Sequence, residues 1–386
     1  MAEINALEKK QISRNPGIEA FKIAAVLFII VSHVTQTIGE ANGYIPYHAY
    51  VIDMWTATTD PQVLLLAFMR HFGVVGNSIF FICSAYFLLD SKKTNVQKWF
   101  FLAANVWVVS VLILIVVFAI RSGDVAPSLI ITSLLPNTLG SNWYMTCYLI
   151  FYPLHPFLNK LIFSLNQKQL FRITFFLAFL YIGCNFLKGL FFSSFLILWV
   201  TIYFAIAYSK LYLPEFMNSR RKNVICLVIG LAGWIGLFLF TDFLGLHSAF
   251  FSNKLLKWVN NCNPFILLCV LASFNLVRQK KTTLLPPPFI NSVAGLSMLI
   301  YIVHENTLLR TYYRIAAVNY IYQHFGYRYI VLWDLLLSLV IFAVTVVICA
   351  IYRATLQKIV ERLSRIICSK IGILWLQFED RVLSWK

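Results

Sequence analysis

The chain contains several runs of apolar residues that are long enough to cross a lipid bilayer. A membrane-spanning helix needs about 20 consecutive, mostly apolar residues at a rise of 1.5 Å per residue. The first such run extends from about Ala20 to Ile38 and carries a single charged residue, Lys22. Because backbone groups in the bilayer core have no water partners, a chain with many such runs must fold as a bundle of helices.

The composition excludes the common soluble classes. Hydrophobic residues make up 60% of the 386 residues and charged residues only 12%, whereas soluble domains carry about 25% charged residues. This excludes an ordinary cytosolic enzyme, a secreted disulfide scaffold and a disordered chain. We therefore predict an all-α polytopic membrane protein with about ten transmembrane helices, near residues 20–38, 72–89, 100–120, 143–163, 171–187, 190–209, 223–241, 262–277, 289–309 and 330–352.

The positive charges predict the orientation of these helices. The net charge of +17 comes mostly from Lys and Arg between the apolar runs, as expected for loops on the cytoplasmic side. No nucleic-acid-binding motif accompanies them, so we exclude a nucleic-acid partner. The loop 39–60 has no Lys or Arg and is predicted to lie outside, and both termini are predicted to be cytoplasmic. One segment departs from the pattern, because Arg310, Arg314 and Arg328 lie where an outside loop is expected; anion binding by these arginines would account for it.

The domain organisation is predicted to be simple. Residues 1–18 form a polar cytoplasmic segment, 19–353 a single transmembrane domain, and 354–386 a cytoplasmic tail. The tail places apolar residues such as Ile359, Leu363 and Ile366 at helical spacing among basic ones, which is typical of an amphipathic helix on the inner membrane face. The alternative is a solvated helix packed on the cytoplasmic loops.

Three ionisable residues within the predicted spans are candidate functional residues, because such groups are costly in a bilayer. Lys22 and His33 are eleven residues apart, so they share one helix face with an axial separation of about 16 Å. Glu19 lies three residues before Lys22 and is placed to pair with it. His304, followed by Glu305, is predicted at the same depth as His33, where the two histidines can meet in one polar cavity. The alternative is that Lys22 extends to the interface and the histidines only pack.

Other polar and aromatic residues are candidates for lining a substrate site, although helix packing explains them equally well. They are Asn77, Ser84, Trp143 and Tyr144. The eight cysteines show neither metal-binding spacing nor paired positions in loops, so we predict no metal.

Four motifs resemble acyltransferase family 3, the integral membrane O-acyltransferases that modify bacterial surface polysaccharides. The resemblance covers about residues 14–350 and departs from the family at Ala85, where glycine is usual, and at Asn142, where histidine is common. The motifs lie at Arg14–His33, Ile79–Leu89, Asn142–Ile162 and, as a late pair, Asn263–Phe274 with Ile300–Asn306.

The resemblance implies transfer of an acyl group, usually acetyl, from cytoplasmic acetyl-CoA to a sugar hydroxyl. The acceptor would be a cell-surface polysaccharide or its lipid-linked precursor, and the protein would lie in the bacterial plasma membrane. For this chemistry we assign Lys22, with Glu19, to the CoA phosphates and His33 to general-base catalysis. His304 and Glu305 complete the predicted catalytic group, and a covalent acyl-histidine step remains open.

Two other functions are compatible with the sequence. A transporter or flippase of a lipid-linked sugar or small acid would also use membrane histidines and a lysine, but the chain shows no repeated halves. A non-catalytic partner of a polysaccharide assembly machine is the third alternative. Assembly as a homo-oligomer is compatible with all three.

Overall fold

The computed structural model describes residues 15–41, 56–139, 142–186, 195–252, 263–280 and 283–384, and these residues form helices and connecting segments without a strand. The helices are α2 (Pro16–Ala41), α3 (Pro61–Met69), α4 (Phe72–Leu88), α5 (Val96–Ile120), α6 (Pro127–Leu134), α7 (Trp143–Ser164), α8 (Gln167–Phe186), α9 (Phe195–Tyr212), α10 (Pro214–Asn218), α11 (Arg220–His247), α12 (Ala249–Ser252), α13 (Pro264–Arg278), α14 (Pro287–Ala294), α15 (Ser297–His304), α16 (Thr307–Leu309), the π-helix η3 (Arg310–Arg314), α17 (Ile315–Phe325), α18 (Ile330–Thr355), α19 (Gln357–Ile367), the π-helix η4 (Cys368–Gly372) and α20 (Ile373–Ser384).

The protein is an all-α polytopic membrane protein. Within the described residues, six helical segments are long and apolar enough to cross a membrane, and a bent pair of helices makes a seventh. Each of the ten segments predicted from the sequence contains helix, but several helices are shorter or less apolar than a full span. The number ten and the orientation of the termini remain predictions. The predicted cytoplasmic segment 1–18 and the predicted outside loop 39–60 lie largely outside the described residues.

Short polar side chains determine where several helices begin. Asp60 accepts hydrogen bonds from the backbone amides of Gln62 and Val63 at the start of α3, and Pro61 supplies a preset first helical residue. Burial acts to raise the pKa of Asp60, but these bonds and one from the Tyr327 hydroxyl, at 2.6 Å, outweigh it and lower the pKa. The charged cap therefore joins α3 to the turn that precedes α18.

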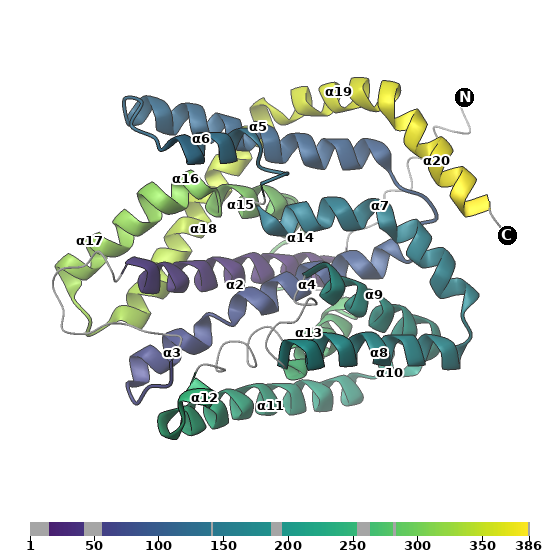
Figure 1. Cartoon of the computed structure of the whole chain (residues 1–386), viewed down its shortest axis with the longest axis horizontal. Coiled ribbons are helices and arrows are strands. Elements are labelled where there is room, and N and C mark those ends of the chain that lie inside the picture. The colour runs from purple at the N-terminus through teal and green to yellow at the C-terminus, as the bar shows by residue number, and fades with distance from the viewer. Residues whose placement is uncertain are drawn as a thin grey trace.

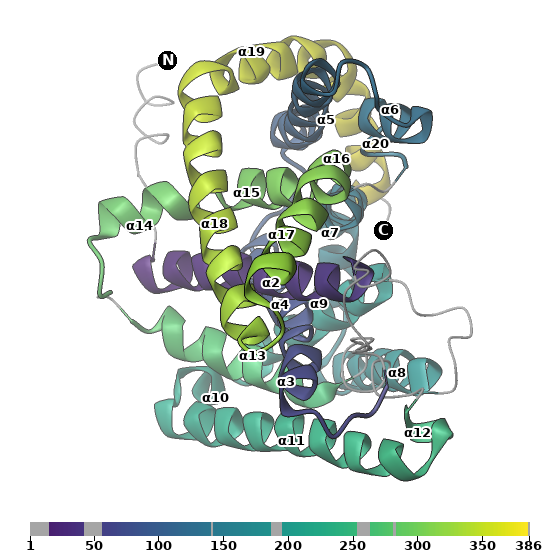
Figure 2. The same ribbon diagram turned by 90° about the vertical axis from the view of Figure 1, so that its left-hand side faces the viewer.

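Helix α2 lies at the centre of the molecule and carries the predicted site (Figures 1 and 2). It packs against α4, α14, α18, α17, α13 and α15. Its contact with α4 is especially close, because a Cβ atom at Gly76 would lie 2.4 Å from the Ala25 carbonyl oxygen, and one at Gly73 would lie 2.7 Å from the Ser32 Oγ. Small residues let two helix backbones approach in a membrane, so these glycines hold α4 directly against the His33 helix.

The prediction of one continuous ninth helix over 289–309 is wrong. The chain bends by 44° between α14 and α15, and α15 ends at His304. The following residues, which include Arg310 and Arg314, form α16, η3 and α17 rather than a loop. The π-helical turn η3 brings the Arg314 side chain inward, where it is buried; such turns are frequent at functional sites.

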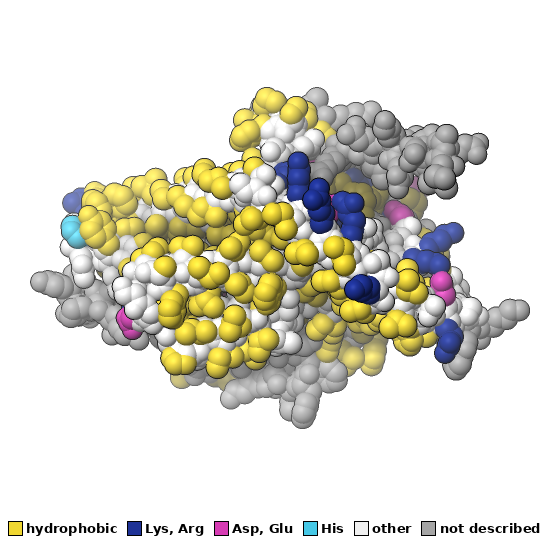
Figure 3. All heavy atoms as spheres, turned by 90° about the horizontal axis from the view of Figure 1, so that it is seen from above, with side chains coloured by type: hydrophobic (Ala, Val, Ile, Leu, Met, Phe, Trp, Pro, Cys, Tyr) yellow, Lys and Arg dark blue, Asp and Glu magenta, His cyan; other side chains and the backbone are white. Residues whose placement is uncertain are grey.

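The C-terminal tail is helical, as the spacing of its apolar residues predicts. It runs along α5 and continues through η4 into α20 (Figure 2). Its apolar stripe faces outward, with Ile359, Leu363 and Ile366 each more than half exposed. Figure 3 shows hydrophobic side chains covering much of the face seen from above, with Lys and Arg gathered over its right half. An exposed apolar stripe beside basic residues suits a membrane interface, and this location remains a prediction.

Glu379 anchors the tail, and its replacement with alanine is expected to release α20. The carboxylate is fully buried and accepts hydrogen bonds from the Thr94 backbone amide at 3.0 Å and the Trp375 indole at 2.9 Å. Hydrogen bonds to charged groups contribute about 1.5–3 kcal/mol each, so limited proteolysis should cleave the tail of Glu379→Ala faster than that of wild type. Glu361→Ala is the control, since Glu361 is exposed and pairs with the exposed Arg365; equal cleavage of all three proteins would contradict the anchoring role.

Candidate active site

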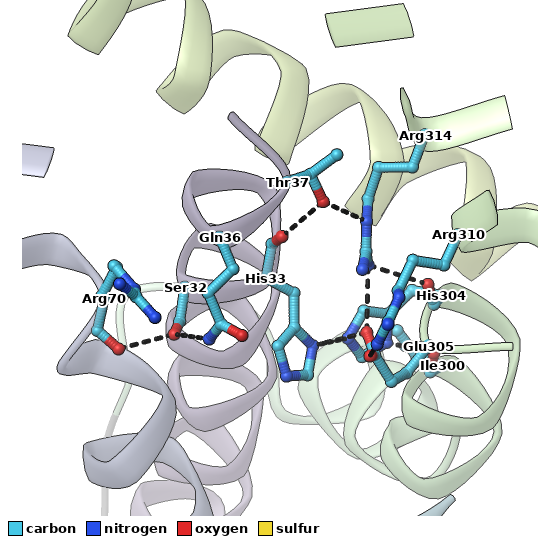
Figure 4. A network of polar contacts seen from close by, with 10 residues as sticks. All are labelled: Ser32, His33, Gln36, Thr37, Arg70, Ile300, His304, Glu305, Arg310 and Arg314. Atoms are coloured by element: carbon cyan, nitrogen blue, oxygen red, sulfur yellow. Dashed lines mark hydrogen bonds and ion pairs between the residues drawn. The ribbon is translucent and has the colours of Figure 1, made fainter. Parts of the chain in front are cut away.

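Two buried histidines from distant parts of the chain meet beside α2 (Figure 4). His33 lies in the middle of α2, and His304 is the last residue of α15. His33 Nδ1 lies 3.1 Å from His304 Nε2, and the two rings are stacked with centroids 5.4 Å apart. The structure thus brings together the two histidines that the sequence places at similar depth.

Glu305 determines which ring nitrogen of His33 carries the proton. Its Oε2 atom lies 2.8 Å from His33 Nδ1, and a carboxylate oxygen accepts hydrogen bonds. Nδ1 of the neutral His33 is therefore protonated, and Nε2 keeps its lone pair. His304 is assigned in the same way, because its Nδ1 lies 2.8 Å from the Ile300 carbonyl oxygen and must donate to it. His304 Nε2 is then an acceptor for the His33 Nδ1 proton.

Arg314 compensates the buried charge of Glu305 and ties the site to α2. Its Nη1 lies 3.0 Å from Glu305 Oε2 and 3.3 Å from the His304 carbonyl oxygen. Its Nε donates to Thr37 Oγ1 at 2.8 Å, and the Thr37 hydroxyl donates in turn to the His33 carbonyl oxygen at 2.8 Å. Arg310 approaches the other Glu305 oxygen at 3.4 Å. A buried carboxylate needs such partners, so the two arginines allow Glu305 to stay ionised beside His33.

The same cluster has the composition of a metal site, because His33, His304 and Glu305 each offer a ligand atom within 4.8 Å of the others. However, the Glu305 oxygen that would bind the ion already accepts from His33 and from the Arg314 guanidinium. A divalent cation there would be repelled by the buried positive charge of Arg314. We therefore interpret the cluster as a hydrogen-bonded His–Glu pair, and the absence of a metal from the reaction remains a prediction.

Lys22 and Glu19 lie on the first two turns of α2, away from the histidines. Lys22 Nζ is 2.8 Å from Glu19 Oε1, and the lysine side chain is 26% exposed while Glu19 is buried. Lys98, near the start of α5, is close enough to Lys22 for the two ammonium groups to repel each other. Two neighbouring cations favour a polyanionic ligand.

The remaining candidate residues are divided between the site and the helix packing. Tyr144 lies next to the site, because its ring is 5.5 Å from that of Tyr301, whose own ring is 5.6 Å from the His304 ring. Trp143 instead stacks on Phe195 at 4.0 Å. Asn77 and Ser84 are partly buried on α4; Ser84 bonds the Tyr148 side chain, and Asn77 Oδ1 has no hydrogen-bond partner.

Sequence reasoning did not assign Thr37, Arg314 or Tyr301 to the site. Thr37 lies four residues after His33, on the same helix face, which is a signal that was available. Arg314 departs from the charge pattern expected of an outside loop, and this departure is the sequence signal for its pairing with Glu305. Ser32, next to His33, faces the end of α3 instead, where its hydroxyl donates to the Arg70 carbonyl oxygen at 2.6 Å.

Comparison with known proteins identifies the family. A search of curated proteins found no match, and a search of solved structures found none either. The acyltransferase domain of acyltransferase family 3 matches residues 15–354, a range that includes α2, the His33–Glu305 pair and all of α18 but its last residue. Because this match covers most of the chain, the protein belongs to acyltransferase family 3 and is a multi-pass membrane acyltransferase.

Proposed function

We propose that the protein is an O-acetyltransferase of the bacterial plasma membrane. It takes an acetyl group from acetyl-CoA on the cytoplasmic side and transfers it to a sugar hydroxyl of a cell-surface polysaccharide or its lipid-linked precursor. The observation that carries this proposal is the 2.8 Å contact between His33 Nδ1 and Glu305 Oε2. A carboxylate at Nδ1 leaves Nε2 free to take a proton, which is what acyl transfer to a hydroxyl needs from a base.

The reaction needs one nucleophilic attack, one bond cleavage and two proton transfers. His33 Nε2 takes the proton of the sugar hydroxyl while the hydroxyl oxygen attacks the thioester carbon. The carbon–sulfur bond then breaks, and the CoA sulfur takes the proton from His33 Nε2. Throughout, Glu305 stabilises the protonated His33, and His304 acts as a positioning residue that accepts from Nδ1.

Lys22 is proposed to bind the CoA phosphates, and replacing it is expected to weaken donor binding. A charge-assisted hydrogen bond contributes about 1.5–3 kcal/mol, so Lys22→Ala should raise the KM for acetyl-CoA about 10- to 100-fold with little change in kcat. Lys22→Arg keeps the charge and should stay near wild type. The measurement is transfer of labelled acetyl from acetyl-CoA by the purified full-length protein. A lower kcat at unchanged KM would contradict phosphate binding.

The family match favours an enzyme over a transporter or flippase. Cells with and without the protein, grown alike, provide the test. Mass spectrometry of their surface glycan should find a mass increase of one acetyl group per modified sugar only where the protein is present. If the two glycans have the same mass, the proposed acceptor is wrong. Purified protein that moves a lipid-linked sugar without acetyl-CoA would support the transporter instead.

A further inference from the structure

The N-terminal end of α7 is buried and unusually short of hydrogen bonds. Asn142 occupies the N-cap position, where asparagine normally accepts from a backbone amide of the first turn, but its side chain makes no such bond. Asn142 is fully buried, and neither its Oδ1 nor its Nδ2 has a partner. A buried polar group without a partner costs about 1–3 kcal/mol, so the unpaired Nδ2 donor points to a bound acceptor.

Tyr301 faces this end of α7. Its ring lies 5.5 Å from the ring of Tyr144, in the first turn of α7, and its hydroxyl makes no hydrogen bond with the described residues. Tyr301 is 3% exposed, so a buried hydroxyl proton is free to be donated. Tyr301 precedes His304 by one helical turn, and their rings are 5.6 Å apart.

The N-terminal end of α7 also contacts α4. The Tyr144 ring lies 6.3 Å from the Phe80 ring of α4. This end of α7 therefore contacts both α15, which carries His304, and α4, which packs against the helix of Lys22 and His33.

We propose that Tyr301, Asn142 and the N-terminal end of α7 form the oxyanion site of the acetyl transfer, and this rests on the proposed function above. When the sugar oxygen attacks the thioester carbon, the carbonyl electron pair moves onto the carbonyl oxygen and makes it negative. The Tyr301 hydroxyl and Asn142 Nδ2 donate to that oxygen, and the positive end of the α7 dipole favours its charge. When the carbon–sulfur bond breaks, the carbonyl re-forms and the negative charge leaves with the CoA sulfur.

This arrangement suits an oxyanion better than a neutral acceptor hydroxyl. The Tyr301 hydroxyl and Asn142 Nδ2 are two hydrogen-bond donors beside a helix N-terminus. Together they favour a negatively charged ligand atom. The proton acceptor of the site, His33 Nε2, is supplied separately by α2. Donors aimed at a developing charge lower the transition state more than the ground state, so their loss reduces kcat.

The test measures kcat and the KM for acetyl-CoA in purified, full-length Tyr301→Phe, Asn142→Ala and Asn142→His. Loss of one oxyanion donor typically costs about 100- to 1,000-fold in kcat, so Tyr301→Phe and Asn142→Ala should lose about 100-fold with unchanged KM. Asn142→His supplies a ring N–H at the position where the resembling family commonly has histidine, and it should recover most of the activity.

Tyr322→Phe is the matched control for Tyr301→Phe, because Tyr322 is also buried and its hydroxyl also lacks a partner, but it lies on α17 away from His304. It should retain wild-type kcat. If wild type transfers acetyl and Tyr301→Phe, Asn142→Ala and Tyr322→Phe all have the same kcat as wild type, the oxyanion site is refuted and the proposed function stands. A raised KM for the glycan acceptor at unchanged kcat would refute it as well, since the residues would then bind the sugar. If wild type itself transfers no acetyl, the proposed function fails first.

Discussion

Alanine at His33 is expected to abolish acetylation of the surface glycan while leaving the protein in the membrane at its normal amount. Nε2 of His33 is the atom proposed to take the sugar proton, and general-base catalysis contributes about 100- to 10,000-fold. The neighbouring His304 is held by its Nδ1 bond to the Ile300 carbonyl oxygen, with Nε2 directed at the His33 position, so we do not expect it to replace the lost base. Mass spectrometry of the glycan from cells with the variant, compared with wild type, is the measurement.

The matched control is His247→Ala, which removes an exposed histidine at the end of α11 and should leave the glycan fully acetylated. Immunoblotting of the membrane fraction must show equal amounts of the three proteins. Full acetylation by His33→Ala at normal protein level would rule out His33 as the base.

Replacement of Glu305 with glutamine is expected to lower kcat nearly as much as loss of His33, although it changes only the carboxylate to an amide. The glutamine amide can donate to His33 Nδ1, and this favours the tautomer whose proton sits on Nε2, the wrong nitrogen for a base. The equivalent change in Ser-His-Asp hydrolases lowers kcat about 10,000-fold. Glutamine also leaves the buried Arg314 guanidinium without its 3.0 Å partner, which destabilises the site further.

Steady-state kinetics of the purified Glu305→Gln variant provide the measurement. The expected result is a lower kcat with little change in the KM for acetyl-CoA, since Glu305 is distant from Lys22 along the proposed donor path. Asp124→Asn is the control, because Asp124 pairs with Arg121 at 2.6 Å on an exposed turn and should keep wild-type kinetics. A Glu305→Gln variant with wild-type kcat would mean that the carboxylate does not set the His33 tautomer.

The helical class and the meeting of the two histidines could be predicted because both depend on short-range regularities. Apolar runs of fixed length identify helices in a bilayer, and a rise of 1.5 Å per residue converts sequence position into depth. His33 and His304 lie at similar counts from the starts of their predicted spans, so equal depth followed from the sequence. That count treats the ninth span as one straight helix, whereas the span bends by 44°; the two rings nevertheless meet, with centroids 5.4 Å apart.

The parts that could not be predicted depend on how the helices are rotated and interrupted. Arg314 reaches Glu305 because η3 inserts a π-helical turn after α16, and the regular 3.6-residue period used for the sequence does not contain such a turn. Tyr301 meets the end of α7 only because α15 is a separate short helix. Trp143 and Tyr144 are adjacent in sequence but contact different neighbours, Phe195 and Tyr301. Residue type alone therefore does not tell which of the two aromatic side chains packs helices and which lies next to the site.

The glycine contact between α2 and α4 bears on how an acetyl group crosses the membrane. With Gly76 against the Ala25 carbonyl and Gly73 against the Ser32 side chain, rotation or sliding of α2 would drive the α4 backbone into the α2 backbone at one position and into the Ser32 side chain at the other. The helix that carries both Lys22 and His33 therefore keeps a fixed position against α4. Under the proposed function, the extended pantetheine arm of the donor covers the distance between the CoA phosphates and the reacting carbon. The length of that arm, and not a rocking motion of the protein, then sets the depth in the bilayer at which the sugar is acetylated.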